Sequence, residues 1–166
     1  LDGKILVNGA PTWNTSRVWS NGVDTTNLKS WLSPENAFDG YVPRNSSEII
    51  DDASYGMGAN QGTTVSWSTT VPTGVSRLTV HALFGSDNTA LTKLTISING
   101  TNTTYGSGYT YFQDIDIAVS GGDSVVVTAG YLSGTDYVYC LGFSFDDDLL
   151  VDANSFGSNG FFLPFD

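Results

Sequence analysis

The chain is poor in positive charge and has no long apolar run. It has six lysine or arginine residues among 166, and its net charge is −11. Nucleic-acid phosphates are bound by clustered lysine and arginine, so we expect no nucleic-acid partner. The same charge disfavours anionic membrane surfaces. No run of about 18 apolar residues occurs, so we expect no membrane insertion.

Residues that carry most enzyme chemistry are also scarce. Cys140 is the only cysteine and lies in an alternating apolar run, which predicts a buried thiol without a disulfide. A Ser-His-Asp triad would have to use His81. That residue lies opposite the apolar side chains of segment 78–84, so we expect it to face solvent. Glu35 and Glu48 are the only glutamates, and no His/Cys spacing suits zinc. We therefore predict a non-enzymatic domain.

The chain does have short segments in which apolar and polar residues alternate, which is typical of strands. Turn signals such as Asn99-Gly100 and Gly121-Gly122-Asp123 recur between them at roughly the 8–12 residue spacing of a sandwich. The pattern predicts an all-β fold, an antiparallel β-sandwich of about eight strands with almost no helix. The predicted apolar stripes are Val65 to Val71, Leu78 to Phe84, Leu94 to Ile98, Ile115 to Val119, Val125 with Val127, and Tyr137 to Phe145.

The first third is less regular. Ile5 to Val7 predicts a short strand, and residues 9–60 predict long loops with at most one helical turn at Ser33-Pro34-Glu35. Segment 2–8 is similar to segment 146–152, either by coincidence of a strand-end pattern or because both end a module of a tandem array. On the second interpretation, residues 1–8 end a preceding module or form a first strand, 9–152 form the sandwich, and 153–166 form a docking segment or linker.

The C-terminal segment concentrates large apolar side chains. Exposed in water, they would form an adhesive patch. We therefore expect the segment to dock on its own sandwich or on a neighbouring module or subunit, with homo-oligomeric symmetry favouring the neighbour. The residues concerned are Phe156, Phe161, Phe162, Leu163 and Phe165.

Two further groups of residues are candidate binding sites. Tyr105, Tyr109 and Tyr111 cluster around glycines, which predicts an exposed aromatic loop able to stack on sugars. Asp39 precedes Gly40 in a tight turn, and carboxylates in loops are the ligands that Ca²⁺ prefers. Asp39 is thus a candidate calcium ligand, while Asp146-Asp147-Asp148 is interpreted as a solvated acidic turn.

Four passages resemble known families. Asn36-Ala37-Phe38-Asp39-Gly40 is similar to the Ala-x-Asp-Gly signature of galactose-binding-like (discoidin-type) jelly rolls, a resemblance that implies a structural calcium at this turn. The opening Asn8 to Trp13, the passage Phe143 to Val151 and the ending Phe156 to Asp166 resemble tandem modules of marine bacteriophage structural proteins. Tyr41-Val42-Pro43-Arg44 departs from the discoidin continuation after Gly40.

The resemblance implies a virion surface module, a tail-fibre, head-fibre or capsid-decoration segment that binds host surface glycans or neighbouring virion subunits. The alternative is a carbohydrate-binding module of a secreted enzyme, with an extracellular location. A glycan-cleaving tail-spike domain is a third candidate. Neighbouring sequence would separate them, because tail or capsid genes favour the first and a hydrolase on the same chain favours the second.

Overall fold

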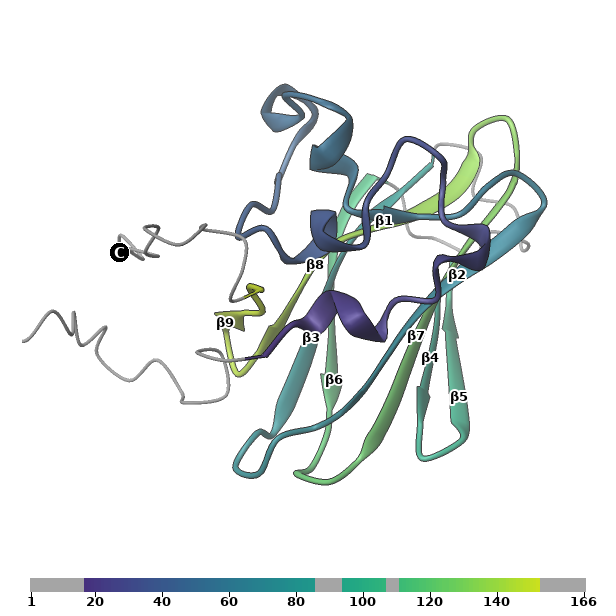
Figure 1. Ribbon diagram of the computed structural model, residues 1–166. Helices are drawn as coiled ribbons and strands as arrows, with labels where there is room; N and C mark the ends of the chain where they lie inside the picture. The colour runs from purple at the N-terminus through teal and green to yellow at the C-terminus, as the bar shows by residue number, and fades with distance from the viewer. Residues whose placement is uncertain (1–16, 86–93, 107–110, 153–166) are drawn as a thin grey trace, which may run out of the picture.

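The computed structural model describes residues 17–85, 94–106 and 111–152. These residues form strands joined by turns and, in the first third, several short 3₁₀ helices (Figure 1). None of the described helices is long and apolar enough to cross a membrane. The helices are η2 (Trp19–Gly22), η3 (Thr25–Asn27), η4 (Pro34–Phe38), η5 (Ser46–Glu48) and η6 (Asp52–Tyr55). The strands are β1 (Met57–Gly58), β2 (Thr63–Thr70), β3 (Arg77–Phe84), β4 (Leu94–Ile98), β5 (Thr101–Tyr105), β6 (Tyr111–Ala118), β7 (Ser124–Ser133), β8 (Asp136–Phe145) and β9 (Asp148–Leu149).

The strands make two packed antiparallel layers, which confirms the predicted fold class. In one layer β5 pairs with β4, β4 with β7, and β7 with β2. In the other layer β6 pairs with β3, and β3 with β8, whose far edge carries β1 and β9. The two layers are joined where β7 and β8 pair next to their hairpin. We call the layer of β6, β3 and β8 the second sheet.

The core lies between the two sheets and is rich in aromatic rings. The Trp67 and Phe143 rings stack with centroids 4.3 Å apart, and Phe38 stacks on Phe143 at 5.3 Å. All three are fully buried. Trp67 comes from β2, Phe143 from β8 and Phe38 from η4, so the irregular first third helps to close one end of the sandwich. Burial of each such side chain contributes about 1.5–3 kcal/mol.

The long apolar stripe of β8 was predicted to lie on one face, and this is wrong. Ala82 pairs with Cys140 while His81 pairs with Gly142, so Leu141 is an extra residue in the β8 strand. Because side chains alternate with a period of two, this bulge reverses which of them face the core. Side chains beyond the bulge, Phe143 and Phe145, pack in the main core. Those before it, such as Tyr139, pack with Leu141 on the outer face.

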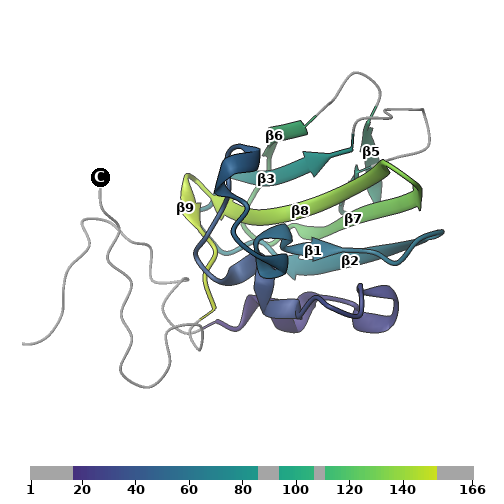
Figure 2. The same ribbon diagram turned by 90° about the horizontal axis from the view of Figure 1, so that it is seen from above.

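The outer face of the second sheet is covered in part by the segment 32–56, from which Leu32, Val42 and Tyr55 pack there. Its blue part lies beside β3, β8 and β9 in Figure 2. A small second cluster forms there, built on Leu32, Leu83, Tyr139 and Leu141. This cover explains why every residue of β3 after Arg77 is buried, on both faces of the strand.

The expectation of at most one helical turn in residues 9–60 is wrong, because five short 3₁₀ helices occur between Trp19 and Tyr55. The glycine turns predicted between strands are present. Asn99 and Gly100 both have positive φ, 50° and 84°, as a type I′ hairpin requires. Gly122, in the Gly121-Gly122-Asp123 turn, has φ 95°. Cys140 is buried, and burial raises the pKa of its thiol to about 12. The expected strand 5–7, the opening 8–13 and the docking segment 156–165 lie outside the described residues.

Candidate functional site

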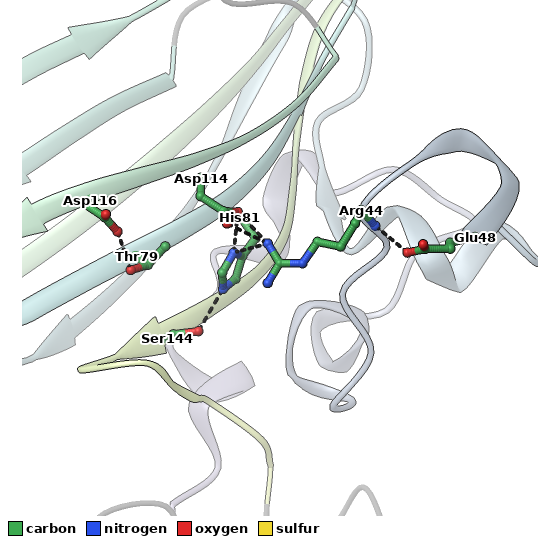
Figure 3. Close-up of polar contacts among 7 residues, drawn as sticks. All are labelled: Arg44, Glu48, Thr79, His81, Asp114, Asp116 and Ser144. Atoms are coloured by element: carbon green, nitrogen blue, oxygen red, sulfur yellow. Dashed lines mark hydrogen bonds and ion pairs between the residues drawn. The ribbon is translucent and has the colours of Figure 1, made fainter. Parts of the chain in front are cut away.

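His81 is the buried centre of a polar network on the outer face of the second sheet (Figure 3). The prediction that this side chain faces solvent is wrong, because only 5% of the residue is exposed. The loop that carries Val42 and Arg44 lies over this face of β3, which strand alternation alone does not reveal. The network joins three neighbouring strands, with Asp114 on β6, His81 on β3 and Ser144 on β8.

The network satisfies both nitrogens of the imidazole. Nδ1 of His81 lies 2.7 Å from Oδ1 of Asp114, and Nε2 lies 2.7 Å from Oγ of Ser144. A neutral ring that donates from Nδ1 to the carboxylate and accepts at Nε2 from the hydroxyl leaves no polar atom of the ring unpaired. This pairing is what makes burial of the only histidine of the chain tolerable.

Arg44 links the network to the loop that covers it. Its Nη1 atom lies 2.7 Å from both carboxylate oxygens of Asp114 and 3.2 Å from Nδ1 of His81. The backbone N–H of Arg44 donates to Glu48 over 2.6 Å, and Asn45 caps η5 through the N–H of Ser47. These bonds hold the guanidinium over the sheet.

The charges set the protonation of the network. Burial lowers the pKa of His81 and outweighs the opposing effect of Asp114, so the imidazole is neutral at neutral pH. Burial alone would raise the pKa of Asp114, but the hydrogen bond from His81 and the nearby Arg44 charge hold it below its ordinary value. The hydrogen bond from His81 and the charge of Arg44 together keep Asp114 ionised.

Ser144, His81 and Asp114 have the order and spacing of a Ser-His-Asp triad, but the serine is not placed to attack a substrate. Only 4% of Ser144 is exposed. The neighbouring pocket is lined by His81 and Asp114 and not by Ser144. The covering loop packs closely against the strand beside His81. A Cβ built on Gly142, the β8 partner of His81, would lie only 2.5 Å from Cγ2 of Val42. The arrangement therefore fits a structural network better than a nucleophilic site.

A second feature is a contiguous group of aromatic rings, which we call the aromatic surface. Successive ring centroids are 5.8 Å apart from Trp31 to Tyr55, 5.2 Å from Tyr55 to Tyr139, 4.9 Å from Tyr139 to Tyr137 and 6.1 Å from Tyr137 to Tyr131. Trp31 is 44% exposed, whereas Tyr139 is buried and forms the floor. The other three rings are half-buried.

Backbone pairing fixes the aromatic surface in place. The N–H of Lys29 donates to the carbonyl of Gly58 over 2.9 Å, and Leu28 forms a bridge with Ala59. This anchors the segment that carries Trp31 beside β1. Nζ of Lys29 lies 4.4 Å from the ring centroid of Tyr131 and 5.3 Å from that of Trp31, distances typical of cation–π contacts. Partial burial among the rings lowers the pKa of Lys29.

Of the three tyrosines predicted to bind ligand, the two that the structure describes lie in different sheets. Tyr105 ends β5 and packs half-buried against the main core. Tyr111 begins β6, at the edge of the other sheet, and is 61% exposed with φ 59°. Tyr109 lies outside the described residues. Trp31 lies in the segment 9–60 that was predicted to form loops, and the sequence spacing holds no signal that joins it to Tyr55 and Tyr139.

Asp39 lies at the end of η4, half-buried, with its Oδ1 accepting from the N–H of Tyr41 over 2.8 Å. Burial raises the pKa of this carboxyl. Asp152 lies beside this turn, because its N–H donates to the carbonyl of Phe38 over 2.9 Å. Asp152 is 1% exposed, and its Oδ2 has no hydrogen-bond partner in the part of the chain that the structure describes. No cluster of three or more His, Cys, Asp or Glu side chains suited to a metal occurs among those residues.

Known proteins offer a limited comparison. No protein-family model and no curated protein matches the chain. Among solved structures, the chain is similar to the family 35 carbohydrate-binding module (CBM35) of Cellvibrio japonicus Abf62, with 21% identity over 70% of this chain and 90% of that one and a TM-score of 0.38. It is also similar to a Xyl-CBM35 in complex with a glucuronic acid containing disaccharide, with 20% identity over 77% and 92% and a TM-score of 0.37. A family 35 module of Clostridium thermocellum has 15% identity over 75% and 85% and a TM-score of 0.33. Likenesses of this degree assign the chain to no family, so its function is inferred from its own residues.

Proposed function

We propose that this domain is a non-catalytic carbohydrate-binding module that binds glycans on the aromatic surface. The observation that carries the proposal is the contiguous ring group of Trp31, Tyr55, Tyr131, Tyr137 and Tyr139 with Lys29 among the rings. Aromatic faces pack against the C–H face of a sugar ring, while phenol hydroxyls and an ammonium group bond its hydroxyls. The proposal concerns this domain and not any further domain of the protein.

Rigidity of the surface supports binding. Three of the rings lie on β7 and β8, and Tyr55 ends η6. Burial raises the pKa of Tyr137 and of Tyr139, so both phenols stay neutral and able to donate at neutral pH. Rings that are already ordered before the ligand arrives lower the entropic cost of binding.

Affinity electrophoresis and calorimetry against a panel of soluble polysaccharides test the proposal. Trp31→Ala should weaken binding about tenfold or more, because it removes buried apolar area and a stacking contact that contributes about 0.5–1.5 kcal/mol beyond area burial. Ile50→Ala is the matched control, since this apolar side chain is 76% exposed and lies outside the aromatic surface. Tyr111→Ala tests the ring predicted from sequence. Equal binding by wild type and Trp31→Ala, with loss in Tyr111→Ala, would move the site to β6.

The place of the module in a larger assembly is a separate proposal. A secreted or extracellular enzyme would use a glycan-binding module to hold its catalytic domain at a polysaccharide, whereas a virion surface protein would use one to hold a host cell. Mass spectrometry of purified virions and the sequence adjoining the module on the same chain distinguish the two.

A further inference from the structure

A pocket lies on the outer face of the second sheet, between the loop that carries Arg44 and the edge strand β6. Its volume is ≈ 180 Å³, and it opens to solvent. Its polar lining includes the charged Arg44 and Asp114 and the neutral His81, and its apolar lining includes Pro43, Phe112 and Leu141. The pocket is separate from the aromatic surface, because the two share no lining residue.

The charged side of the pocket is held in place before any ligand binds. Asp114 is fixed by Nη1 of Arg44 and by Nδ1 of His81, each 2.7 Å from its Oδ1 atom. Both members of the ion pair stay about half exposed, at 53% for Arg44 and 49% for Asp114. An ionised carboxylate has about four lone-pair sites, and a guanidinium has five N–H donors. Among the described residues, the side-chain contacts of Arg44 use only the donors on its Nη1 atom. Further acceptor capacity on Asp114 and further donors on Arg44 therefore remain for a ligand in the pocket that both residues line.

The chemistry of this lining selects a neutral polyhydroxylated ring. A free anion such as phosphate would meet the Asp114 carboxylate, and a cation would meet the Arg44 guanidinium. Adjacent hydroxyls of a sugar can instead donate to the carboxylate and accept from the guanidinium at the same time, as charge-assisted hydrogen bonds. The half-buried Phe112 ring and the Leu141 side chain provide the apolar wall that the C–H face of such a ring requires.

The pocket and the aromatic surface lie on the same face of the second sheet. Tyr139, Leu83 and Phe112 pair in one row across β8, β3 and β6, and Asp114 is two residues further along β6. With strands about 4.8 Å apart and a rise of about 3.4 Å per residue, the Cα atoms of Tyr139 and Asp114 are roughly 12 Å apart. That separation suits two positions along one oligosaccharide.

From these observations we infer that the pocket lined by Arg44 and Asp114 is a second subsite, which binds a neutral sugar unit of the same glycan that stacks on the aromatic surface. The inference rests on the proposed function. It predicts that long oligosaccharides bind more tightly than short ones, and that the gain depends on the carboxylate of Asp114 and the guanidinium of Arg44.

Isothermal titration calorimetry with neutral xylo-, manno- and cello-oligosaccharides of two to six units tests the inference. For the series that binds, Asp114→Asn and Arg44→Gln should each weaken the longest ligand about tenfold or more and the disaccharide much less. Asp116→Asn is the matched control. This residue lies on the same strand and face, bonds Thr79 over 2.6 Å, and does not line the pocket. Melting curves verify that each variant is folded.

A measurement on the wild type keeps the inference testable if a variant fails to fold. Addition of the hexasaccharide should shift the backbone amide signals of Phe112, Gln113 and Asp114 and the imidazole signal of His81, in addition to those of the aromatic surface. If Trp31→Ala loses binding while Asp114→Asn and Arg44→Gln bind every ligand like wild type, the second subsite is wrong and the proposed function stands. If no glycan binds the wild type, both are wrong.

Discussion

At the scale of single residues, the notable feature is the buried imidazole of His81. A buried neutral imidazole is stable only because Asp114 and Ser144 satisfy both of its nitrogens. Its charged form would have to be desolvated, and this is why burial lowers the pKa of His81 despite the adjacent carboxylate. The network therefore stabilises the fold as long as the ring stays neutral.

This pKa shift predicts the direction of a pH effect on stability. The unfolded chain takes up a proton at His81 below about pH 6.5, whereas the folded chain takes it up only at lower pH. The free energy of unfolding should therefore be highest above about pH 6.5 and fall as the pH drops below it, down to the folded pKa. Urea unfolding between pH 5 and 8 measures this. His81→Gln should be less stable at pH 8 and should lack the slope.

Because the chain has one histidine, nuclear magnetic resonance gives an independent check. The imidazole C–H signals of the folded wild type should titrate below the value of an unfolded peptide. A titration above about 6.5 would contradict the burial argument, because it would mean that the attraction of Asp114 outweighs desolvation.

At the scale of elements, strand β8 and the segment beside it decide which side chains reach each face. The bulge at Leu141 sends Phe143 and Phe145 into the core and leaves Tyr137 and Tyr139 for the aromatic surface. Gly56, between η6 and β1, packs against the same part of β8. Its φ is +61°, and a Cβ there would lie 2.1 Å from the carbonyl oxygen of Cys140. Only glycine fits this approach.

Substitutions at two glycines with positive φ, Gly62 and Gly56, measure separately the stability cost of backbone strain and that of a steric clash. Gly62 has φ +77°, and a Cβ added to it would have no other atom within 4 Å, whereas a Cβ on Gly56 would clash with backbone. Gly62→Ala should cost about 1 kcal/mol of unfolding free energy, from the left-handed conformation alone. Gly56→Ala should cost clearly more, because β8 must shift. Chemical denaturation measures both, and equal losses would show that β8 yields easily at Cys140.

At the scale of the whole molecule, the two ends of the described chain meet. Oδ1 of Asp152 accepts from the backbone N–H groups of Trp19 and Ser20 over 2.5 and 3.2 Å. The N–H of Asp152 in turn binds the carbonyl of Phe38, in the turn that ends at Asp39. A buried carboxylate with an unpaired oxygen next to this turn is a site where a cation would be stabilising.

The calcium prediction made from Asp39 can be tested at this junction. Calcium should raise the melting temperature, because a ligand that binds only the folded state adds about 2.7 kcal/mol at a hundred times its dissociation constant. Asp152→Asn and Asp39→Ala should each remove the calcium-dependent increment, and Asp116→Asn should keep it. Identical melting of the wild type in calcium and in chelator would rule the ion out.

The sequence by itself determined the architecture. Alternation with a period of two and turn residues such as Asn99-Gly100 report local backbone preferences, so most strands, their turns and the buried Cys140 were predictable. The tertiary structure alone decided the sites. The face reached by Tyr139 depends on a one-residue bulge, and the burial of His81 depends on the loop that carries Val42 and Arg44. The meeting of Trp31 with Tyr55 and Tyr139 depends on β1 pairing with β8. These are contacts between distant parts of the chain, and no local pattern encodes them.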